Sequence, residues 1–273
     1  MKSLLIALLF VFSVNTFAQI EDTTRINKKD ASGMKQGYWE KKYRNGNIAY
    51  SVIFKNDKPI GDFKRYFENG KIKVYLKFDD EGNNLNAKFY HQNGNVSVTG
   101  RYDQSNMKDG VWNYFNRNNS LVLVESYKNG IKNGTEKKYF ENGQKAEELY
   151  WQNGLMHGEL KRFGEGGQLV FSILHKQGKR DGAFTIYHPG GNKYISGMYS
   201  DDKPTGKWQY FNEHGEFVQF IEYDANGYPI NIDEIREREN KRLNKLGEQK
   251  GKIKELDFDS FFSNPNGPAQ QPR

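Results

Sequence analysis

Cysteine is absent from the 273-residue sequence, proline is scarce at 7 residues, and no hydrophobic run reaches the length of a membrane span. The absence of cysteine excludes disulfide bonds, thiol catalysis, cysteine-ligated zinc, Fe–S clusters and lipid attachment at an N-terminal cysteine. Aromatic residues, by contrast, make up 15% of the chain, and hydrophobic residues of all kinds make up 36%. This is too much apolar material for a disordered chain, so we expect a folded protein whose aromatic side chains carry much of the packing. By length alone the chain would form one or two domains.

Residues 1–18 have the pattern of an export signal. Lys2 supplies a positive charge, Leu4 to Val14 form an apolar run, and the small residues Thr16 and Ala18 precede a cleavage site. The run is too short for a transmembrane anchor, which needs about 20 apolar residues. We therefore expect export with cleavage near Ala18, a periplasmic or extracellular location, and no integral membrane protein.

Positive charge is in modest excess. The net charge is +7, and it falls to +6 when Lys2 leaves with the signal. Sequence windows suggest that the surplus is thinly spread, because residues 37–60 hold five basic and two acidic side chains whereas residues 206–230 hold one basic and four acidic. Nucleic-acid binding needs a clustered basic face, so we do not expect a nucleic-acid partner. The surplus fits solubility and weak attraction to anionic cell-envelope polymers.

The end of the chain has helical character followed by a turn-rich tail. Apolar residues at helical spacing between charges predict a helix over residues 231–247, started by a cap at Asn231 or Asp233 and stopped at Gly247. Residues 248–273 contain several Pro, Gly and Asn and predict a flexible tail. The tail also contains three aromatic residues that offer apolar groups for docking on a neighbouring surface: Phe258, Phe261 and Phe262.

An internal repeat dominates the rest of the sequence. Eight units run from Gly37 to about Ile230 with a spacing of 24 residues, and the third unit is one residue longer and starts with Leu85 instead of glycine. The other starting residues are Gly37, Gly61, Gly110, Gly134, Gly158, Gly182 and Gly206. Counting the starting residue as place 0, seven of the eight units have an aromatic at place +5, seven have a glycine at place +9, and seven have an aromatic at place +17.

The repeat predicts a β-hairpin in each unit. Asn-Gly pairs at places +8 and +9, such as Asn69-Gly70, are typical of type I′ hairpin turns. The residues after the turn alternate between apolar and polar, as in a strand with one buried face. Because a lone hairpin is at best marginally stable, the units must share a core with their neighbours. We therefore expect an all-β fold, an elongated antiparallel meander of about sixteen strands over residues 37–230, preceded by a leader at 19–36.

One detail of the first strand stays open at this point. Strict alternation does not place the aromatics at places +2 and +5 on one face of the sheet. A β-bulge between them is one solution, but the sequence does not decide it.

The units resemble a known family. The pattern G-x-W/F-x-x-Y/F-x-x-N-G, followed by an alternating strand that ends in an aromatic, resembles the MORN repeat and, more closely, the MORN-variant repeats of the YwqK antitoxin-like family. The resemblance covers residues 37–230. It implies a β-hairpin array used as an interaction scaffold, which in some bacterial members is named as the neutralising partner of a toxin. This chain differs from a cytosolic antitoxin in its export signal and in its C-terminal helix and tail.

The sequence contains no constellation that indicates catalysis. Its histidines fall in different units without a metal-ligand spacing: His91, His157, His175, His188 and His214. Paired carboxylates such as Asp79-Asp80 and Asp201-Asp202 fall in predicted turns, and no glycine-rich segment opens a helix as a phosphate-binding loop does. We expect no enzyme activity, no catalytic or metal-binding residues and no cofactor.

Aromatic residues at place +2 are the candidate partner-binding residues: Trp39, Phe63, Trp112, Phe184 and Trp208. One interpretation is cross-strand packing, which a chain poor in aliphatic residues needs for stability. The other is an exposed recognition ladder, since aromatics are enriched at interface hot spots.

Two functions follow as hypotheses. The first is an exported, non-enzymatic scaffold that binds a protein partner, with toxin neutralisation as one form. The alternative is a cell-envelope binder whose aromatic and basic rows contact polysaccharide, peptidoglycan or anionic lipid. The sequence contains nothing that identifies the partner.

Overall fold

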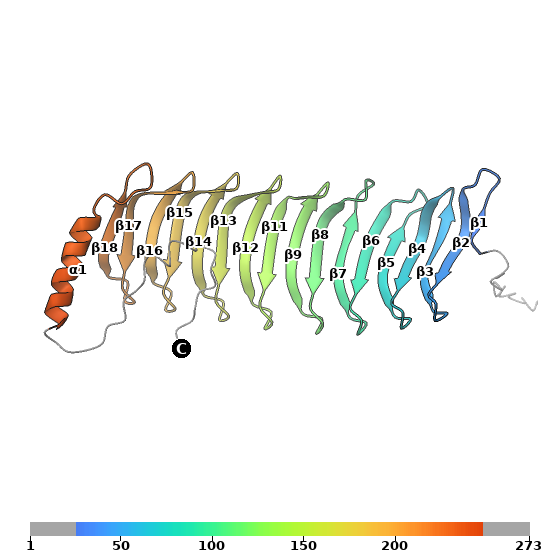
Figure 1. The fold of residues 1–273 in the computed structure, drawn as a ribbon, viewed down its shortest axis with the longest axis horizontal. Coiled ribbons are helices and arrows are strands. Elements are labelled where there is room, and N and C mark those ends of the chain that lie inside the picture. Colours follow the sequence, from blue (N-terminus) through green and yellow to red (C-terminus); the bar gives the residue numbers. More distant parts are fainter. Residues whose placement is uncertain (1–25, 248–273) are drawn as a thin grey trace, which may run out of the picture. The chain divides into compact units, whose positions relative to one another are not determined.

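A computed structural model describes residues 26–247. The predicted export signal, most of the predicted leader and the predicted tail lie outside these residues. The described chain is one antiparallel meander of 18 strands followed by one helix, which confirms the predicted all-β hairpin architecture (Figure 1). The meander divides into two compact units, one ending at Gly167 and one beginning at Gln168.

The first compact unit contains thirteen strands. Their bounds are β1 (Lys28–Lys29), β2 (Lys35–Lys42), β3 (Ile48–Lys55), β4 (Lys58–Tyr66), β5 (Ile72–Phe78), β6 (Asn84–Tyr90), β7 (Val96–Tyr102), β8 (Lys108–Phe115), β9 (Leu121–Lys128), β10 (Ile131–Lys132), β11 (Gly134–Tyr139), β12 (Lys145–Gln152) and β13 (Leu155–Phe163). Each strand pairs with the next along the chain, except that β9 pairs with both β10 and β11. β1 adds a short strand from the predicted leader to the edge of β2.

The second compact unit contains five strands and the helix. Their bounds are β14 (Leu169–Lys176), β15 (Lys179–Tyr187), β16 (Lys193–Ser200), β17 (Lys203–Phe211), β18 (Phe217–Tyr223) and α1 (Ile232–Gly247). The helix was predicted at 231–247, and it lies beside β18 (Figure 1). Among the described residues no helix is both long and apolar enough to cross a membrane.

The Asn-Gly hairpin tips do not form the predicted type I′ turns. In the first repeat the Gly46 N–H donates to the Tyr43 carbonyl at 3.0 Å, and Asn45 keeps a negative φ while Gly46 has φ of 87°. This is a three-residue loop with a type I turn and a glycine bulge. The Asn45 side chain is used instead as a hydrogen-bond acceptor for the N–H of Asn47 and as a donor to the Glu68 carbonyl of the next repeat.

Type I′ turns occur instead at five of the junctions between successive repeats. Both central residues have positive φ at Asn56–Asp57, with 53° and 62°, and at Asp201–Asp202, with 51° and 69°. The same conformation recurs at three pairs that contain glycine: Asn129–Gly130, Asn153–Gly154 and Gln177–Gly178. A two-residue loop of this type matches the twist of the strands it joins, so it keeps neighbouring repeats in one continuous sheet.

The hairpins have a β-bulge, but it lies on the second strand and not between the two aromatics of the first strand. The pairing register shifts between places +4 and +5, for example between Arg65 and Tyr66 and between Tyr210 and Phe211. The same shift occurs in the first, third, fourth, fifth and seventh repeats. In the second repeat Arg65 pairs with Val74 and Tyr66 with Ile72, so the extra residue, Lys73, belongs to the second strand. The shift therefore leaves the alternation of the first strand unchanged.

One row of side chains runs across the strands of each compact unit and forms its core. The row takes place +2 from the first strand and place +15 from the second strand of each repeat, and these places are paired across the sheet in, for example, Trp39↔Val52, Phe63↔Leu76 and Trp208↔Ile221. We call the face that carries this row the packed face and the opposite face the open face. Neither compact unit has a second sheet against its row among residues 26–247, so the row is buried by side chains of neighbouring strands.

Two glycines in this row make room for tryptophans. Gly100 and Gly197 have ordinary φ values, but a Cβ on either would lie 2.3 Å from the indole of Trp112 or Trp208, respectively. Both indoles are almost completely buried, at 1% and 0% exposure. The bulky ring of one strand therefore lies flat on the backbone of the strand before it.

Asparagine side chains occupy the two edges of the meander. Asn27 accepts from the Glu40 N–H at 2.9 Å and donates to the Glu40 carbonyl at 3.0 Å on β2. Asn231 accepts from the Glu222 N–H at 2.8 Å and donates to the Phe220 carbonyl at 3.1 Å on β18. Each amide takes the place of a peptide group from a further strand, and Asn231 thus ties the start of α1 to the sheet.

Substitution of Gly100 by alanine is expected to lower the free energy of unfolding by about 1–3 kcal/mol, because the added methyl group overlaps the Trp112 indole. Urea unfolding followed by circular dichroism measures the change. Gly190→Ala is the matched control, since a Cβ at Gly190 meets nothing within 4 Å. Combining Gly100→Ala with Trp112→Leu should give a smaller loss than the sum of the two single losses; strict additivity would contradict the proposed contact.

Candidate functional site

The five candidate aromatics lie on the packed face. Trp112, Phe184 and Trp208 are buried, and Trp39 and Phe63 are half-buried. Trp208 contacts three rings, with centroids at 4.8 Å from Phe184, 5.0 Å from Tyr199 and 5.8 Å from Tyr223. This geometry supports the packing interpretation. The three buried rings, Trp112, Phe184 and Trp208, offer no surface to a partner and therefore do not form a recognition ladder.

A cation covers the ring at place +17 in four repeats. The cations stand at place −2, and their distances to the ring centroids are 4.8 Å for Lys35 over Phe54, 4.8 Å for Lys108 over Tyr127, 4.9 Å for Lys132 over Trp151 and 4.5 Å for Arg180 over Tyr199. Cation–π contacts of this kind stabilise when the cation is partly desolvated. They help to bury the rings of a single-layer sheet. The sequence contained the signal, because these four repeats have a basic residue two places before their starting glycine.

The apolar row of the packed face is interrupted by a pair of carboxylates. Glu125 and Glu136 occupy places +15 and +2 on the neighbouring strands β9 and β11, and both are buried, at 7% and 6% exposure. The Lys132 ammonium bridges them, at 2.7 Å from Glu125 Oε1 and 2.6 Å from Glu136 Oε2. Without this cation two like charges would face each other in a desolvated position.

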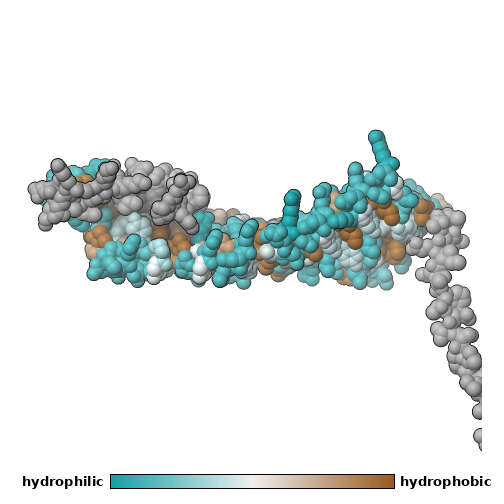
Figure 2. Space-filling model, turned by 90° about the horizontal axis from the view of Figure 1, so that it is seen from below, coloured by the Kyte–Doolittle hydropathy of each residue, from teal (hydrophilic) through white to brown (hydrophobic). Residues whose placement is uncertain are grey.

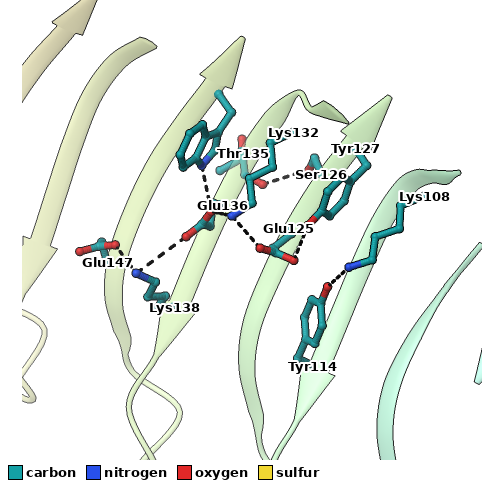
Figure 3. Close-up of polar contacts among 11 residues, drawn as sticks. Lys108, Tyr114, Glu125, Ser126, Tyr127, Lys132, Thr135, Glu136, Lys138 and Glu147 are labelled. Atoms are coloured by element: carbon teal, nitrogen blue, oxygen red, sulfur yellow. Dashed lines mark hydrogen bonds and ion pairs between the residues drawn. The ribbon is translucent and has the colours of Figure 1, made fainter. Parts of the chain in front are cut away.

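Aromatic donors complete the environment of the two carboxylates (Figure 3). The Tyr127 hydroxyl donates to Glu125 Oε2 and the Trp151 indole N–H donates to Glu136 Oε2, each at 2.9 Å. Burial works to raise the pKa of Glu125, but hydrogen bonds from Lys132, Tyr114 and Tyr127 outweigh it and hold that pKa below its ordinary value. Burial and the Glu125 carboxylate raise the pKa of both tyrosines, which therefore remain neutral donors.

The network continues along the packed face with alternating charge. Lys138 lies 3.8 Å from Glu136 and 2.8 Å from Glu147, and the Arg162 guanidinium lies 2.8 Å from the second oxygen of Glu147. Burial works to raise the pKa of Glu147, but Lys138 and Arg162 hold it below its ordinary value. The charged chain thus joins β9 to β13. At its other end the Lys108 ammonium lies 2.7 Å from the Tyr114 hydroxyl on β8 (Figure 3).

Exposed apolar side chains lie on the open face of the same stretch. They form what we call the apolar patch: Met107, Val111, Ile131, Tyr150 and Leu155, with exposures of 41%, 54%, 52%, 43% and 49%. The face assignment follows from alternation, because Lys108 and Lys132, next to Met107 and Ile131, reach rings of the packed face. Tyr150 pairs with His157, two residues beyond Leu155, which places Tyr150 and Leu155 on one face.

The centre of the apolar patch is a ridge of three residues at place −3. Met107, Ile131 and Leu155 belong to three consecutive repeats and lie next to the turns between repeats. The side chain of Met107 packs against Gly130 and that of Ile131 against Gly154, so the residues follow one another along the sheet without a gap. Other repeats have lysine at this place: Lys58, Lys179 and Lys203. That contrast was readable from the sequence once the repeats were aligned.

The described surface shows no cleft with catalytic chemistry. Two shallow depressions have volumes of about 260 and 500 Å³ and are lined by polar, aromatic and acidic residues of turns and strand ends. Among residues 26–247 no three His, Asp or Glu side chains gather in a way that could hold a metal ion. On the side of the molecule drawn in Figure 2, hydrophilic residues cover most of the described surface, with hydrophobic residues set between them. The expectation of a non-enzymatic protein without cofactor stays a prediction.

His175 is a buried histidine whose pKa is lowered. It stands at place +17, where other repeats have an aromatic ring, and it is 9% exposed, with a buried Nδ1 that has no hydrogen-bond partner. Burial lowers its pKa below the ordinary value, the Asp202 carboxylate opposes this, and Arg180 across the strand pair adds to it. The folded protein therefore favours the neutral imidazole.

The pH dependence of stability should change in His175→Tyr. A lowered folded pKa means that the unfolded chain binds the proton more readily, so stability falls as pH falls below about 6.5. Urea unfolding at pH 7.5 and 5.5 should show a loss on acidification in the wild type and a smaller loss in the variant, which has the ring found at Tyr199. His214→Asn at an exposed hairpin tip is the control and should behave as the wild type. An unchanged pH response in His175→Tyr would refute the assignment.

Removal of the central cation should expose the cost of the carboxylate pair. Lys132→Met is expected to lower the free energy of unfolding by about 3–5 kcal/mol at pH 7, because it leaves two buried carboxylates without a counter-charge. The facing carboxylates raise each other's pKa, so this variant should regain stability between pH 7 and pH 5 as one of them is protonated. Urea unfolding at both pH values measures this.

A triple variant provides the matched control for that experiment. Glu125→Leu, Lys132→Met and Glu136→Leu together install the residues of equivalent places in neighbouring repeats, Leu149, Met156 and Leu160. The triple variant should be more stable at pH 7 than Lys132→Met alone. The network is not the source of the loss if both variants are equally unstable.

Comparison with known proteins supports the repeat assignment. Among solved structures, one titled "Crystal Structure of TcdB2-TccC3-Cdc42" matches with 10% identity and a TM-score of 0.14; the match covers 75% of this chain and 17% of that chain. A TM-score this low carries no argument about fold or function. No curated protein matches the chain. Residues 35–56, 59–80 and 132–153 match the family model described as MORN repeat variant, and each match runs from place −2 to place +19 of its repeat. The chain therefore contains the MORN repeat variant in three places, at its first, second and fifth repeats.

Proposed function

We propose that the protein is a non-enzymatic repeat scaffold that binds a protein partner through the apolar patch on its open face. The observation that carries the proposal is the exposure of Met107, Ile131 and Leu155, at 41%, 52% and 49%, on three consecutive repeats. Contiguous exposed apolar side chains mark interaction sites on soluble proteins. Three other repeats have lysine at place −3, so the exposed apolar side chains there are a feature of the ridge and not of the array as a whole.

The packed face makes the open face a suitable platform. The network from Lys108 to Arg162 joins consecutive strands directly behind the apolar patch, and its buried members are fully paired. Residues at the same place in successive repeats are two strands apart, which is about 9.6 Å. A partner thus meets apolar side chains at a regular interval on a sheet whose strands are cross-linked on the other side.

The finer parts of the proposal rest on sequence. The pattern of residues 1–18 supports export with cleavage near Ala18, and the resemblance to the YwqK antitoxin-like family supports toxin neutralisation as the form of the interaction. The envelope-binding alternative depends on aromatic rings that stack on glycans, and burial of Trp112 and Trp208 removes two of them. A protein partner is therefore the better-supported choice.

Replacement of the ridge by lysine should abolish partner binding. Met107→Lys, Ile131→Lys and Leu155→Lys together give the ridge the residue that other repeats have there, so the sheet should remain folded. Affinity capture from the organism's own envelope extract, with the mature chain and with the variant, identifies proteins retained only by the mature chain. Each is then purified, and its affinity for the variant should be at least tenfold weaker by titration calorimetry.

Leu174→Lys is the control for this experiment, because Leu174 is also an exposed apolar residue, at 37%, but lies on β14 of the second compact unit. It should leave binding unchanged. Partners retained equally by the ridge variant, with an unaltered circular dichroism spectrum, would rule out the apolar patch as the binding surface.

A further inference from the structure

Positive charge is concentrated at one end of the meander, contrary to the even spread suggested by sequence windows. Residues 28–88 contain 14 basic and 8 acidic side chains, whereas residues 89–167 contain 10 and 9, and residues 168–247 contain 11 and 11. The strands β1–β6 therefore hold almost the whole surplus of the described chain. Charge at this density on β1–β6 points to an anionic partner.

Three lysines on the open face of β4–β6 form what we call the lysine patch: Lys64, Lys77 and Lys88. Lys64 and Lys88 lie directly opposite Tyr75 on its two sides, and Lys77 lies two residues along β5. Their sequence neighbours Phe63, Leu76 and Ala87 belong to the core row, so the lysines point to the other face.

The lysine patch has little internal compensation. Asp62 lies 3.6 Å from Lys64 and accepts a hydrogen bond from the Tyr75 hydroxyl at 2.8 Å. Asp62 is the one carboxylate among the residues directly paired with the three lysines. By contrast, lysines beside the apolar patch are paired, Lys137 with Glu148 and Lys161 with Glu159. The open face therefore changes along the first compact unit from basic to apolar and internally neutral.

We infer that the partner is a protein whose contact face carries carboxylates beside apolar side chains, the carboxylates over the lysine patch and the apolar groups over the apolar patch. The inference rests on the proposed function and adds the chemistry of the partner to it. Both patches lie on the same face of the same compact unit, on β4–β6 and on β8–β13. An anionic polysaccharide would satisfy the lysines but leave the apolar patch uncovered, which favours an acidic protein face.

The test uses the mature chain and defined probes: a fluorescent random copolymer of glutamate and tyrosine, polyglutamate of equal length, and vesicles of phosphatidylglycerol. The copolymer should bind several-fold more tightly than polyglutamate, and its binding should weaken as ionic strength rises, because exposed charges are screened. Lys64→Glu, Lys77→Glu and Lys88→Glu together should weaken copolymer binding at least tenfold at low salt and remove most of its salt dependence. Fluorescence anisotropy measures both.

The control variant has the same change of net charge elsewhere. Lys176→Glu, Lys193→Glu and Lys203→Glu alter three exposed lysines of the second compact unit, and binding should stay within twofold of the wild type. Circular dichroism must show both variants folded.

Three results would overturn the inference. The first is equal binding of the copolymer by the two lysine variants. The second is equal binding of copolymer and polyglutamate by the wild type, which would mean attraction by charge alone. The third is tighter, lysine-dependent binding to the vesicles than to the copolymer, which would make a lipid surface the occupant. The captured partner distinguishes this inference from the proposed function. If the ridge variant loses the partner while the variant with Lys64→Glu, Lys77→Glu and Lys88→Glu binds it fully, the proposed function stands and only this inference fails.

Discussion

Burial in this protein depends on cross-strand contact between side chains on one face of a single-layer sheet. A sandwich or a helix-covered sheet buries its core between two layers. Within residues 26–247 the core row of each compact unit is covered instead by side chains of neighbouring strands. The indole of Trp112 reaches almost zero exposure because it lies on the bare backbone of Gly100 and under the Lys108 ammonium. A large side chain on one strand thus packs where the neighbouring strand has no side chain, and the Lys108 ammonium covers the outer face of the ring.

The same constraint explains why the carboxylate pair is tolerated. A row that is one residue wide cannot surround Glu125 and Glu136 with apolar layers, so both remain within reach of long side chains from their own and adjacent strands. Lys132, Tyr127 and Trp151 use that reach to satisfy them. Replacing an apolar core by a paired network costs stability in many proteins, yet here it joins consecutive strands behind the exposed apolar patch. The two departures from the repeat pattern, one on each face, occupy the same strands.

Much of the fold could be predicted from the periodicity of the sequence. The errors concern features that periodicity does not determine, namely the turn type and the exposure of individual side chains. The 24-residue spacing located the hairpins, and the spacing of apolar residues located α1. The predicted type I′ turn at the Asn-Gly tips was wrong, because Asn-Gly also suits a three-residue loop in which only the glycine needs a positive φ. The type I′ conformation is adopted instead by pairs such as Asn56–Asp57, which contains no glycine. Exposure of the aromatics could not be derived, since it depends on which cation covers which ring. Glu125 and Glu136 stood at core places in the aligned repeats, but only the register shows that they face each other.

The asparagines at the two edges of the meander bear on how the protein meets other molecules. Open sheet edges invite strand addition and aggregation, and a repeat sheet has a tendency to grow by the same hydrogen bonds that built it. Asn27 and Asn231 occupy backbone groups of β2 and β18 with single side-chain amides, so a further strand would first have to displace them. Association is thereby directed away from the ends and toward the faces, where recognition depends on side chains and is open to selection one repeat at a time.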